Sequence, residues 1–189
     1  MRYIVFLALL FIGGMGVFSC TKYKDTKTTG NPHLTNPYCN DPNAVNYNWN
    51  FPGTPDNSIC FYPTDIFKGV YEFHDSVFFT TTGFFISYDT FIITIAKNST
   101  TKFTIAGFCT SGASLGLTAG VNYVATVDTM IGDSTTTVRG QPLCSVADTI
   151  NGTLTKDRLN DSLMYINFVV ASDTGVTTTH IGSARLLHK

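Results

Sequence analysis

Apolar and polar residues alternate in a series of short stretches between residue 65 and the C-terminus. In one of them Phe91, Ile93 and Ile95 share a face, although Ile92 interrupts the polar face opposite. Because side chains alternate across a strand, this period of two predicts β-strands that bury one face. Further strands of this kind are predicted over Lys102–Gly107, 121–127, 149–155 and His180–Leu187, and Leu163–Val170 is apolar on both faces, as a central strand would be.

Glycine, asparagine, aspartate and serine fill the gaps between these stretches, as expected of turns between short strands. No segment after residue 20 repeats with the 3.6-residue period of a helix. The pattern therefore predicts an all-β domain over residues 65–189, either an antiparallel sandwich or a barrel.

The start of this domain, Phe67-Lys-Gly-Val-Tyr71, resembles the opening strand of small lipocalin-like barrels in lipoproteins of the Bacteroidetes group. Thr101–Phe108, Asp148–Leu154 and Leu163–Val170 agree loosely with later strands of those proteins. The resemblance implies an antiparallel up-and-down barrel of about eight strands, a closed fold without exposed sheet edges.

Aromatic residues gather around Thr80–Gly83, which is predicted to be the tip of the hairpin between the first two strands of this domain. Packed inward, they would be part of the core. Exposed at the mouth of a barrel, they would form an apolar patch for a ligand or a partner. The residues of this candidate patch are Phe78, Phe79, Phe84, Phe85 and Tyr88.

The first 19 residues have the pattern of an export signal. Arg2 precedes an uncharged apolar run, Tyr3–Ile12, and small residues follow before Cys20. The run is short for a transmembrane span, which needs roughly 20 apolar residues. An uncleaved membrane helix is therefore the weaker interpretation.

Val17-Phe18-Ser19-Cys20 resembles the lipobox of bacterial lipoproteins, although Phe18 is bulkier than usual. The resemblance implies cleavage before Cys20, lipid on that cysteine, and a place in the bacterial cell envelope, with the outer membrane as the expected membrane. An ordinary secretory signal with a chance cysteine is the alternative. Residues 20–37 are polar, unpatterned and interrupted by proline and glycine, and they predict a flexible tether.

If Cys20 carries lipid, four of the five cysteines remain, and four cysteines allow three pairings. Proximity in sequence favours Cys39–Cys60 and Cys109–Cys144, each worth roughly 3 kcal/mol in the chain-entropy model. Free buried thiols are the alternative. They are less favoured, because an exported protein meets an oxidising compartment in which disulfides form. A metal site is disfavoured, because no two cysteines are close in sequence.

Residues 38–64 are rich in turn-forming residues and bounded by cysteines, which predicts a disulfide-stapled turn module. Asp41, Asn43 and Asp56 are also a weak calcium candidate, but two carboxylates are few and the EF-hand spacing is absent. The segment resembles short Cys-bounded segments of Bacteroidetes surface proteins through Cys39, Asp41, Ala44, Asn46, Tyr47, Asn48, Asp56, Asn57, Ser58, Cys60 and Tyr62.

Charge and sequence motifs reduce the number of functions that the sequence allows. Only 13% of the residues are charged and the basic ones are scattered, so nucleic acid is not an expected partner. Gly112-Ala-Ser114-Leu-Gly116 matches the hydrolase motif Gly-x-Ser-x-Gly, with Asp148 and His180 following in hydrolase order. That motif needs a strand that turns into a helix, and none is predicted here.

The histidines on predicted strands, His74 and His180, are a further possibility for chemistry. Glu72 and Asp75 flank His74, but acid–base work needs a cleft that the sequence does not locate. The leading hypothesis is therefore a non-enzymatic, lipid-anchored β-barrel without a cofactor, which binds a small apolar ligand or an envelope component. The alternatives are a structural or adhesive surface domain that binds a protein or glycan through its loops and, remotely, a hydrolase that uses Ser114.

Overall fold

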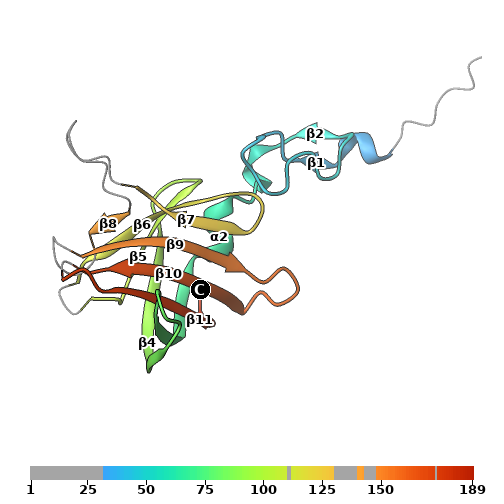
Figure 1. Ribbon diagram of the computed structural model, residues 1–189. Helices are drawn as coiled ribbons and strands as arrows, with labels where there is room; N and C mark the ends of the chain where they lie inside the picture. The colour runs from blue at the N-terminus through green and yellow to red at the C-terminus, as the bar shows by residue number, and fades with distance from the viewer. Residues whose placement is uncertain (1–31, 110–111, 130–139, 143–147, 173) are drawn as a thin grey trace, which may run out of the picture.

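The structure is a computed structural model, and it describes residues 32–109, 112–129, 140–142, 148–172 and 174–189. A small turn module leads through a short helix into a β-barrel (Figure 1). The predicted fold class, an all-β chain with an antiparallel barrel after a disulfide-stapled module, is confirmed.

Eight antiparallel strands form a closed barrel in which successive strands pair and the last strand pairs with the first. This closure aligns β11 with β3 from Thr178 opposite Phe79 to His188 opposite Val70. The strands are β3 (Gly69–Phe79), β4 (Phe85–Lys97), β5 (Lys102–Ala106), β6 (Ser114–Ala119), β7 (Val124–Val127), β9 (Thr149–Lys156), β10 (Leu163–Ala171) and β11 (Thr177–His188), and a two-residue strand, β8 (Gln141–Pro142), pairs with β9 beyond the end of β7.

The interior of the barrel is built by the alternation that the sequence displays. On β3, Tyr71, Phe73 and Val77 point inward and are buried, whereas Glu72 and His74 point outward. Burial of such apolar faces is the main stabilising contribution of the fold. The other buried apolar residues of the barrel strands are Ile93, Ile95, Phe103, Ile105, Leu115, Leu117, Ala119, Ala125, Val127, Ile150, Leu154, Met164, Ile166, Phe168 and Ala184.

Two predictions about strands are wrong in detail. Ser114–Ala119 is a strand that was not among those predicted, and Leu115 and Leu117 form its buried face. The strand predicted from Val121 begins only at Val124. Tyr123 has a φ of 68°, a turn conformation that extended strands do not adopt, so the alternation before it was accidental.

The strand predicted as central, Leu163–Val170, has only one buried face. Tyr165 on β10 is 48% exposed, while Met164 and Ile166 beside it are buried. A closed single-layer barrel leaves the outer face of each strand uncovered, so an apolar outer residue here does not indicate a second packed layer.

A helix that the sequence analysis did not predict, α2 (Pro63–Phe67), closes one end of the barrel. Phe67 is buried and stacks on Phe103 with ring centroids 5.3 Å apart. Thr64 Oγ1 donates to the Ser99 carbonyl at 2.8 Å, and Asp65 pairs with Lys97 at 2.7 Å. Five residues are too few to show a helical period, although proline at the first helical position is a typical start signal.

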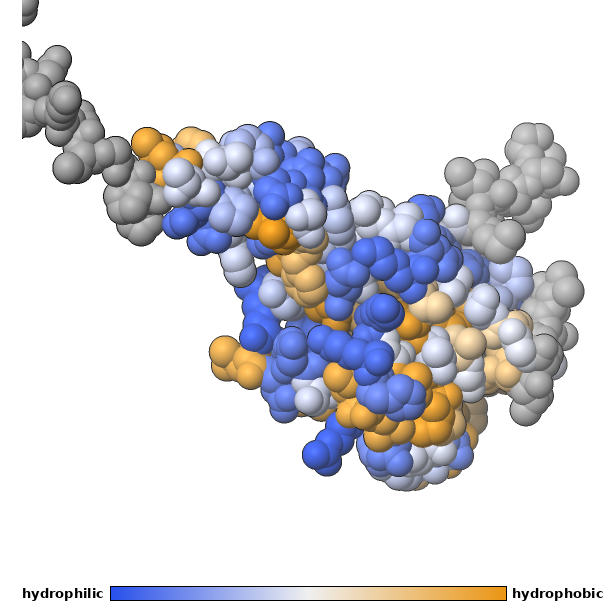
Figure 2. Space-filling view, turned by 180° about the vertical axis from the view of Figure 1, so that it is seen from behind, coloured by the Kyte–Doolittle hydropathy of each residue, from blue (hydrophilic) through white to orange (hydrophobic). Residues whose placement is uncertain are grey.

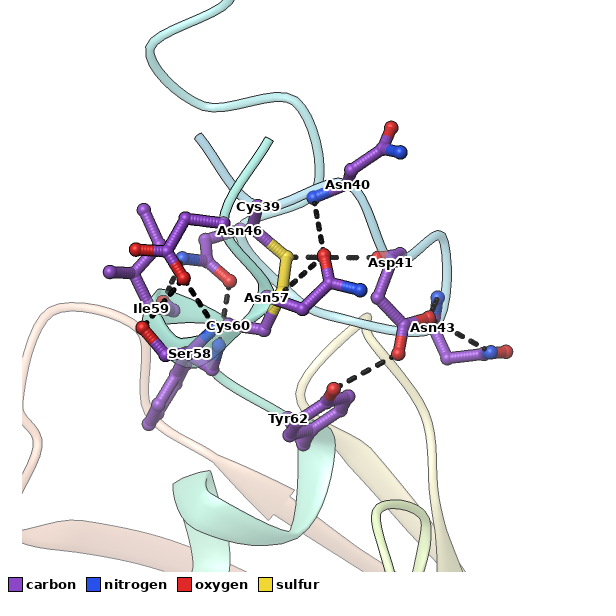
Figure 3. Close-up of a disulfide and its surroundings, with 12 residues drawn as sticks. Cys39, Asn40, Asp41, Asn43, Asn46, Asn57, Ser58, Ile59, Cys60 and Tyr62 are labelled. Carbon is purple, nitrogen blue, oxygen red and sulfur yellow. Dashed lines mark hydrogen bonds between the residues drawn. A yellow bond between two sulfur atoms is a disulfide. The ribbon is translucent and has the colours of Figure 1, made fainter. Parts of the chain in front are cut away.

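The N-terminal module is held by the disulfide Cys39–Cys60, whose Cα atoms are 5.0 Å apart (Figure 3). The Asn46 side chain spans the same loop, because its Oδ1 accepts from Phe61 N at 2.7 Å and its Nδ2 donates to the Ile59 carbonyl at 2.9 Å. The regular elements of the module are short: η1 (Pro32–Thr35), β1 (Pro37–Tyr38), β2 (Thr54–Pro55) and η2 (Asn57–Ile59). Among the described residues, no helix is both long and apolar enough to span a bilayer.

A lysine is buried at the helix-capped end of the barrel. Lys156 is 1% exposed, and its Nζ donates to Tyr71 Oη at 2.9 Å and lies 4.7 Å from the centre of that ring. Tyr71 Oη in turn donates to the Phe67 carbonyl at 2.8 Å. Burial lowers the pKa of Lys156 from 10.5 to about 8, because desolvation disfavours the charged ammonium.

Removing the disulfide should loosen the module selectively. The loop between Cys39 and Cys60 spans 21 residues, so the variant Cys39→Ser/Cys60→Ser should lose roughly 3 kcal/mol against local opening. Limited proteolysis followed by mass spectrometry should then show cleavage within residues 40–59 roughly a hundredfold faster. Equal cleavage rates in the parent and the variant would contradict a stabilising role for this bridge.

Lys156 should make stability depend on pH in the alkaline range. Between pH 8 and 10.5 the unfolded chain retains a proton that the folded chain has lost, so the free energy of unfolding should rise with pH. Lys156→Met should raise the Tm at pH 7 and flatten this rise, since methionine removes the buried charge. Denaturant titrations from pH 7 to 9.5 measure the slope, and Lys102→Met, at an exposed salt bridge, is the control. A variant with the parent's slope would show that Lys156 does not titrate in this range.

Candidate functional site

The barrel contains a cavity of about 360 Å³ in the half opposite α2, toward the β3–β4 and β10–β11 hairpins. Six apolar side chains supply most of its wall, and polar side chains from β3, β4 and β11 complete it. A small, largely apolar cavity with a few converging polar groups is the usual form of a small-molecule site. The lining residues are Asp75, Val77, Asp89, Thr90, Phe91, Phe108, Ile150, Phe168, Val170 and His180.

Phenylalanines form the inner boundary of the cavity. Phe91 packs edge-on against Phe108 and against Phe73, with ring centroids 5.5 Å and 5.3 Å apart. Phe108 in turn packs edge-on against Phe168 at 5.5 Å. Such edge-to-face contacts fix the orientation of each ring, so this wall is shaped before any ligand arrives.

A histidine and an aspartate meet at the polar side of the cavity. His180 Nδ1 lies 2.6 Å from Asp75 Oδ2, and the Asp75 side chain is only 4% exposed. Thr178 Oγ1 lies 3.2 Å from the other ring nitrogen of His180, which fixes the orientation of the imidazole. Asp75 Oδ1 is buried and has no hydrogen-bond partner among the described residues.

The strand register explains how these side chains come together. Gly182 on β11 is opposite Asp75, and His180, two residues earlier on β11, shares the inward face with Gly182. A Cβ at Gly182 would lie 2.8 Å from Phe73 Cε2, so a side chain does not fit there. Asp89 on β4 is opposite Asp75 on the other side, and it accepts a hydrogen bond from Ser87 Oγ at 3.1 Å.

Asp75 and His180 are 105 residues apart, and no pattern in the sequence connects them. By position in the sequence Asp75 groups with Glu72 and His74, but these two lie on the outer face, with His74 Nε2 3.4 Å from Glu72 Oε2. The signal that separates them is the period of two, because Asp75 shares its face with Tyr71 and Phe73. Asp89, which faces the same cavity, was missed altogether.

The candidate aromatic patch lies on the β3–β4 hairpin. Phe84, Phe85, Tyr88 and Phe79 are 71%, 59%, 58% and 43% exposed, and Phe78 is half-buried. Figure 2 shows apolar surface gathered at the lower right, where this hairpin projects from the barrel. A groove of about 420 Å³ runs between this hairpin and the β10–β11 hairpin. None of the five side chains lines the interior cavity.

Ser114 is not placed to act with His180. Ser114 begins β6 and faces outward, since Leu115 and Leu117 beside it are buried inward. β6 and β11 are four strands apart in either direction around the barrel, so the two residues belong to opposite walls. His180 faces inward and contacts Asp75.

The calcium candidates serve as turn and helix caps. Asp41 Oδ1 accepts from Asn43 N at 2.9 Å, and its Oδ2 accepts from Tyr62 Oη at 2.9 Å (Figure 3). These bonds, the backbone one first, lower the pKa of Asp41. Asp56 caps η2 through Ser58, and those bonds lower its pKa also. The described residues contain no cluster of three or more acidic, histidine or cysteine side chains that could hold a metal.

The remaining predicted site residues are cysteines. The pairing of Cys39 with Cys60 is confirmed. Cys109 is disulfide-bonded, but Cys144, its predicted partner, lies outside the described residues, so that pairing stays a prediction. Cys20 and the export signal also lie outside them.

Comparison with known proteins adds little to the site. No family model matches the chain, and no curated protein matches it. One similar solved structure is a protein of unknown function from the DUF3598 family of Nostoc punctiforme, with a TM-score of 0.42 and 7% sequence identity. The match covers 65% of this chain and 49% of that one, so the chain spans about half the length of that protein. A likeness this distant carries no functional argument.

Proposed function

We propose that this protein is a lipid-anchored cell-envelope β-barrel that binds a small, largely apolar ligand in its interior cavity and catalyses no reaction. The observation that carries the proposal is the cavity of about 360 Å³, bounded by fixed phenylalanine rings inside a closed barrel. Its volume lies at the lower end of the range typical of small-molecule sites, roughly 300–1,000 Å³, so a compact ligand is favoured.

The anchoring part of the proposal rests on the sequence around Cys20. The apolar run before it and Val17-Phe18-Ser19-Cys20 fit the lipoprotein signal described above. The polar residues that follow are a sufficient tether between the lipid and the turn module. A lipid-anchored binding protein would hold its cavity close to the membrane without a spanning segment.

A second candidate function, adhesion through loops, is supported by the exposed hairpin. Phe84 and Phe85 expose most of their surface at the tip, beside the groove between the two hairpins. Exposed apolar clusters of this kind are typical of partner-binding surfaces. The double variant Phe84→Ser/Phe85→Ser removes both rings and distinguishes adhesion from ligand binding, because ligand binding inside the barrel should be unaffected.

Blocking the cavity should abolish ligand binding. The neutral fluorescent probe N-phenyl-1-naphthylamine should bind the purified protein, and Val77→Trp, which places a bulky ring in the cavity, should weaken binding at least tenfold. Each protein in this assay also carries Cys20→Ser, which keeps lipid and detergent out of the measurement. The matched control is Ile181→Trp, an exposed position on the outer face of β11. Equal probe affinity in both tryptophan variants, at unchanged Tm, would place the binding site outside the barrel.

Cys20 should decide whether the protein associates with membranes. In the parent, metabolic labelling with a fatty-acid analogue and partition into the detergent phase of a cloud-point extraction are expected. Cys20→Ser should lose both, because a soluble domain without lipid has no anchor. A Cys20→Ser protein that partitions into detergent like the parent would refute the anchor.

A further inference from the structure

The cavity contains a polar atom whose partner is missing. Asp75 Oδ2 is 2.6 Å from His180 Nδ1, but Asp75 Oδ1 is buried without a hydrogen-bond partner among the described residues. A carboxylate oxygen that has lost water without gaining a donor is unfavourable, and native proteins seldom retain one. Because Asp75 lines the cavity, a donor that occupies the cavity lies beside this carboxylate.

The charges around this atom favour a positively charged donor. Asp89 is opposite Asp75 in the β3–β4 register, and both aspartates line the cavity. His180 is the only basic residue among the described lining residues, where neither lysine nor arginine occurs. With both carboxylates ionised, even a protonated His180 leaves an excess of negative charge. Because the Asp75 side chain is buried, its charge is screened less than that of Asp89, which is exposed to solvent.

We infer that the ligand of this cavity is an amphipathic amine, whose apolar body packs against Phe91, Phe108 and Phe168 and whose protonated amino group donates to Asp75 Oδ1. The inference rests on the proposed function and adds the chemical class of the ligand's polar end. An ammonium group has three donors and no acceptor, so it satisfies an acceptor-only site. An alcohol supplies one neutral donor, and a carboxylate would be repelled by both aspartates.

A matched ligand series tests this class. Octylamine, octan-1-ol and octanoate have the same apolar chain and differ in the charge and donors of their polar end. Each would compete with N-phenyl-1-naphthylamine for the purified Cys20→Ser protein at neutral pH. Octylamine should bind at least tenfold more tightly than octan-1-ol, as expected of a charge-assisted hydrogen bond, and octanoate should bind most weakly.

Variants of the two aspartates test whether these residues cause the preference for octylamine. Asp75→Asn should lower octylamine affinity at least tenfold and leave octan-1-ol affinity within about twofold, because the amide removes the charge but keeps the shape. Asp89→Asn removes the second negative charge at the cavity. Because Asp89 is exposed to solvent, this variant still tests the preference for the amine if Asp75→Asn fails to fold. Glu72→Gln is the matched control, on the outer face of the same strand, and it should preserve the preference.

The outcomes separate this inference from the proposed function. If octan-1-ol and octylamine compete equally and Val77→Trp blocks both, the cavity binds apolar ligands and the amine inference is overturned. Tightest binding of octanoate, or an amine preference that survives both aspartate variants, overturns it as well. If neither the fluorescent probe nor any of the three ligands binds, the proposed function fails too.

Discussion

The pairing of the last strand with the first is the interaction on which the rest of the structure depends. The β11–β3 register closes the barrel, buries the inward faces of all eight strands, and places His180 beside Asp75 although 105 residues separate them. Until this pairing forms, neither the cavity nor its polar end exists. Contacts of such long range are costly in chain entropy, so closure is expected to be a late step of folding.

The barrel departs from uniform apolar packing at its two ends in different ways. At the end covered by α2, Lys156 is buried against Tyr71, with its Nζ donating to the tyrosine oxygen. In the other half, Asp75 is buried with one oxygen satisfied and one not. In the first arrangement the lysine nitrogen has a hydrogen-bond partner inside the barrel. The second is incomplete, and incomplete polar groups in a rigid interior are expected at functional sites rather than in the scaffold.

Much of the fold could be predicted because strand alternation is local. The inward residues of β4 and β5, such as Ile93, Ile95 and Phe103, follow from a period of two, and Cys39–Cys60 follows from proximity. The aromatic hairpin could not be assigned to a face, since the register shifts between Val77 and Phe78 and so breaks the alternation. The contact between His180 and Asp75 could not be predicted from local pattern, because it depends on which strands become neighbours.

The position of helix α2 determines which end of the barrel is connected to the N-terminal part of the chain. The chain enters the barrel through α2 (Figure 1), and the lining residues place the cavity in the opposite half. Any attachment at the N-terminus therefore joins the barrel at the end that α2 covers, and the cavity lies in the opposite half. The connection to the N-terminal module and the opening of the cavity therefore do not compete for the same end of the barrel.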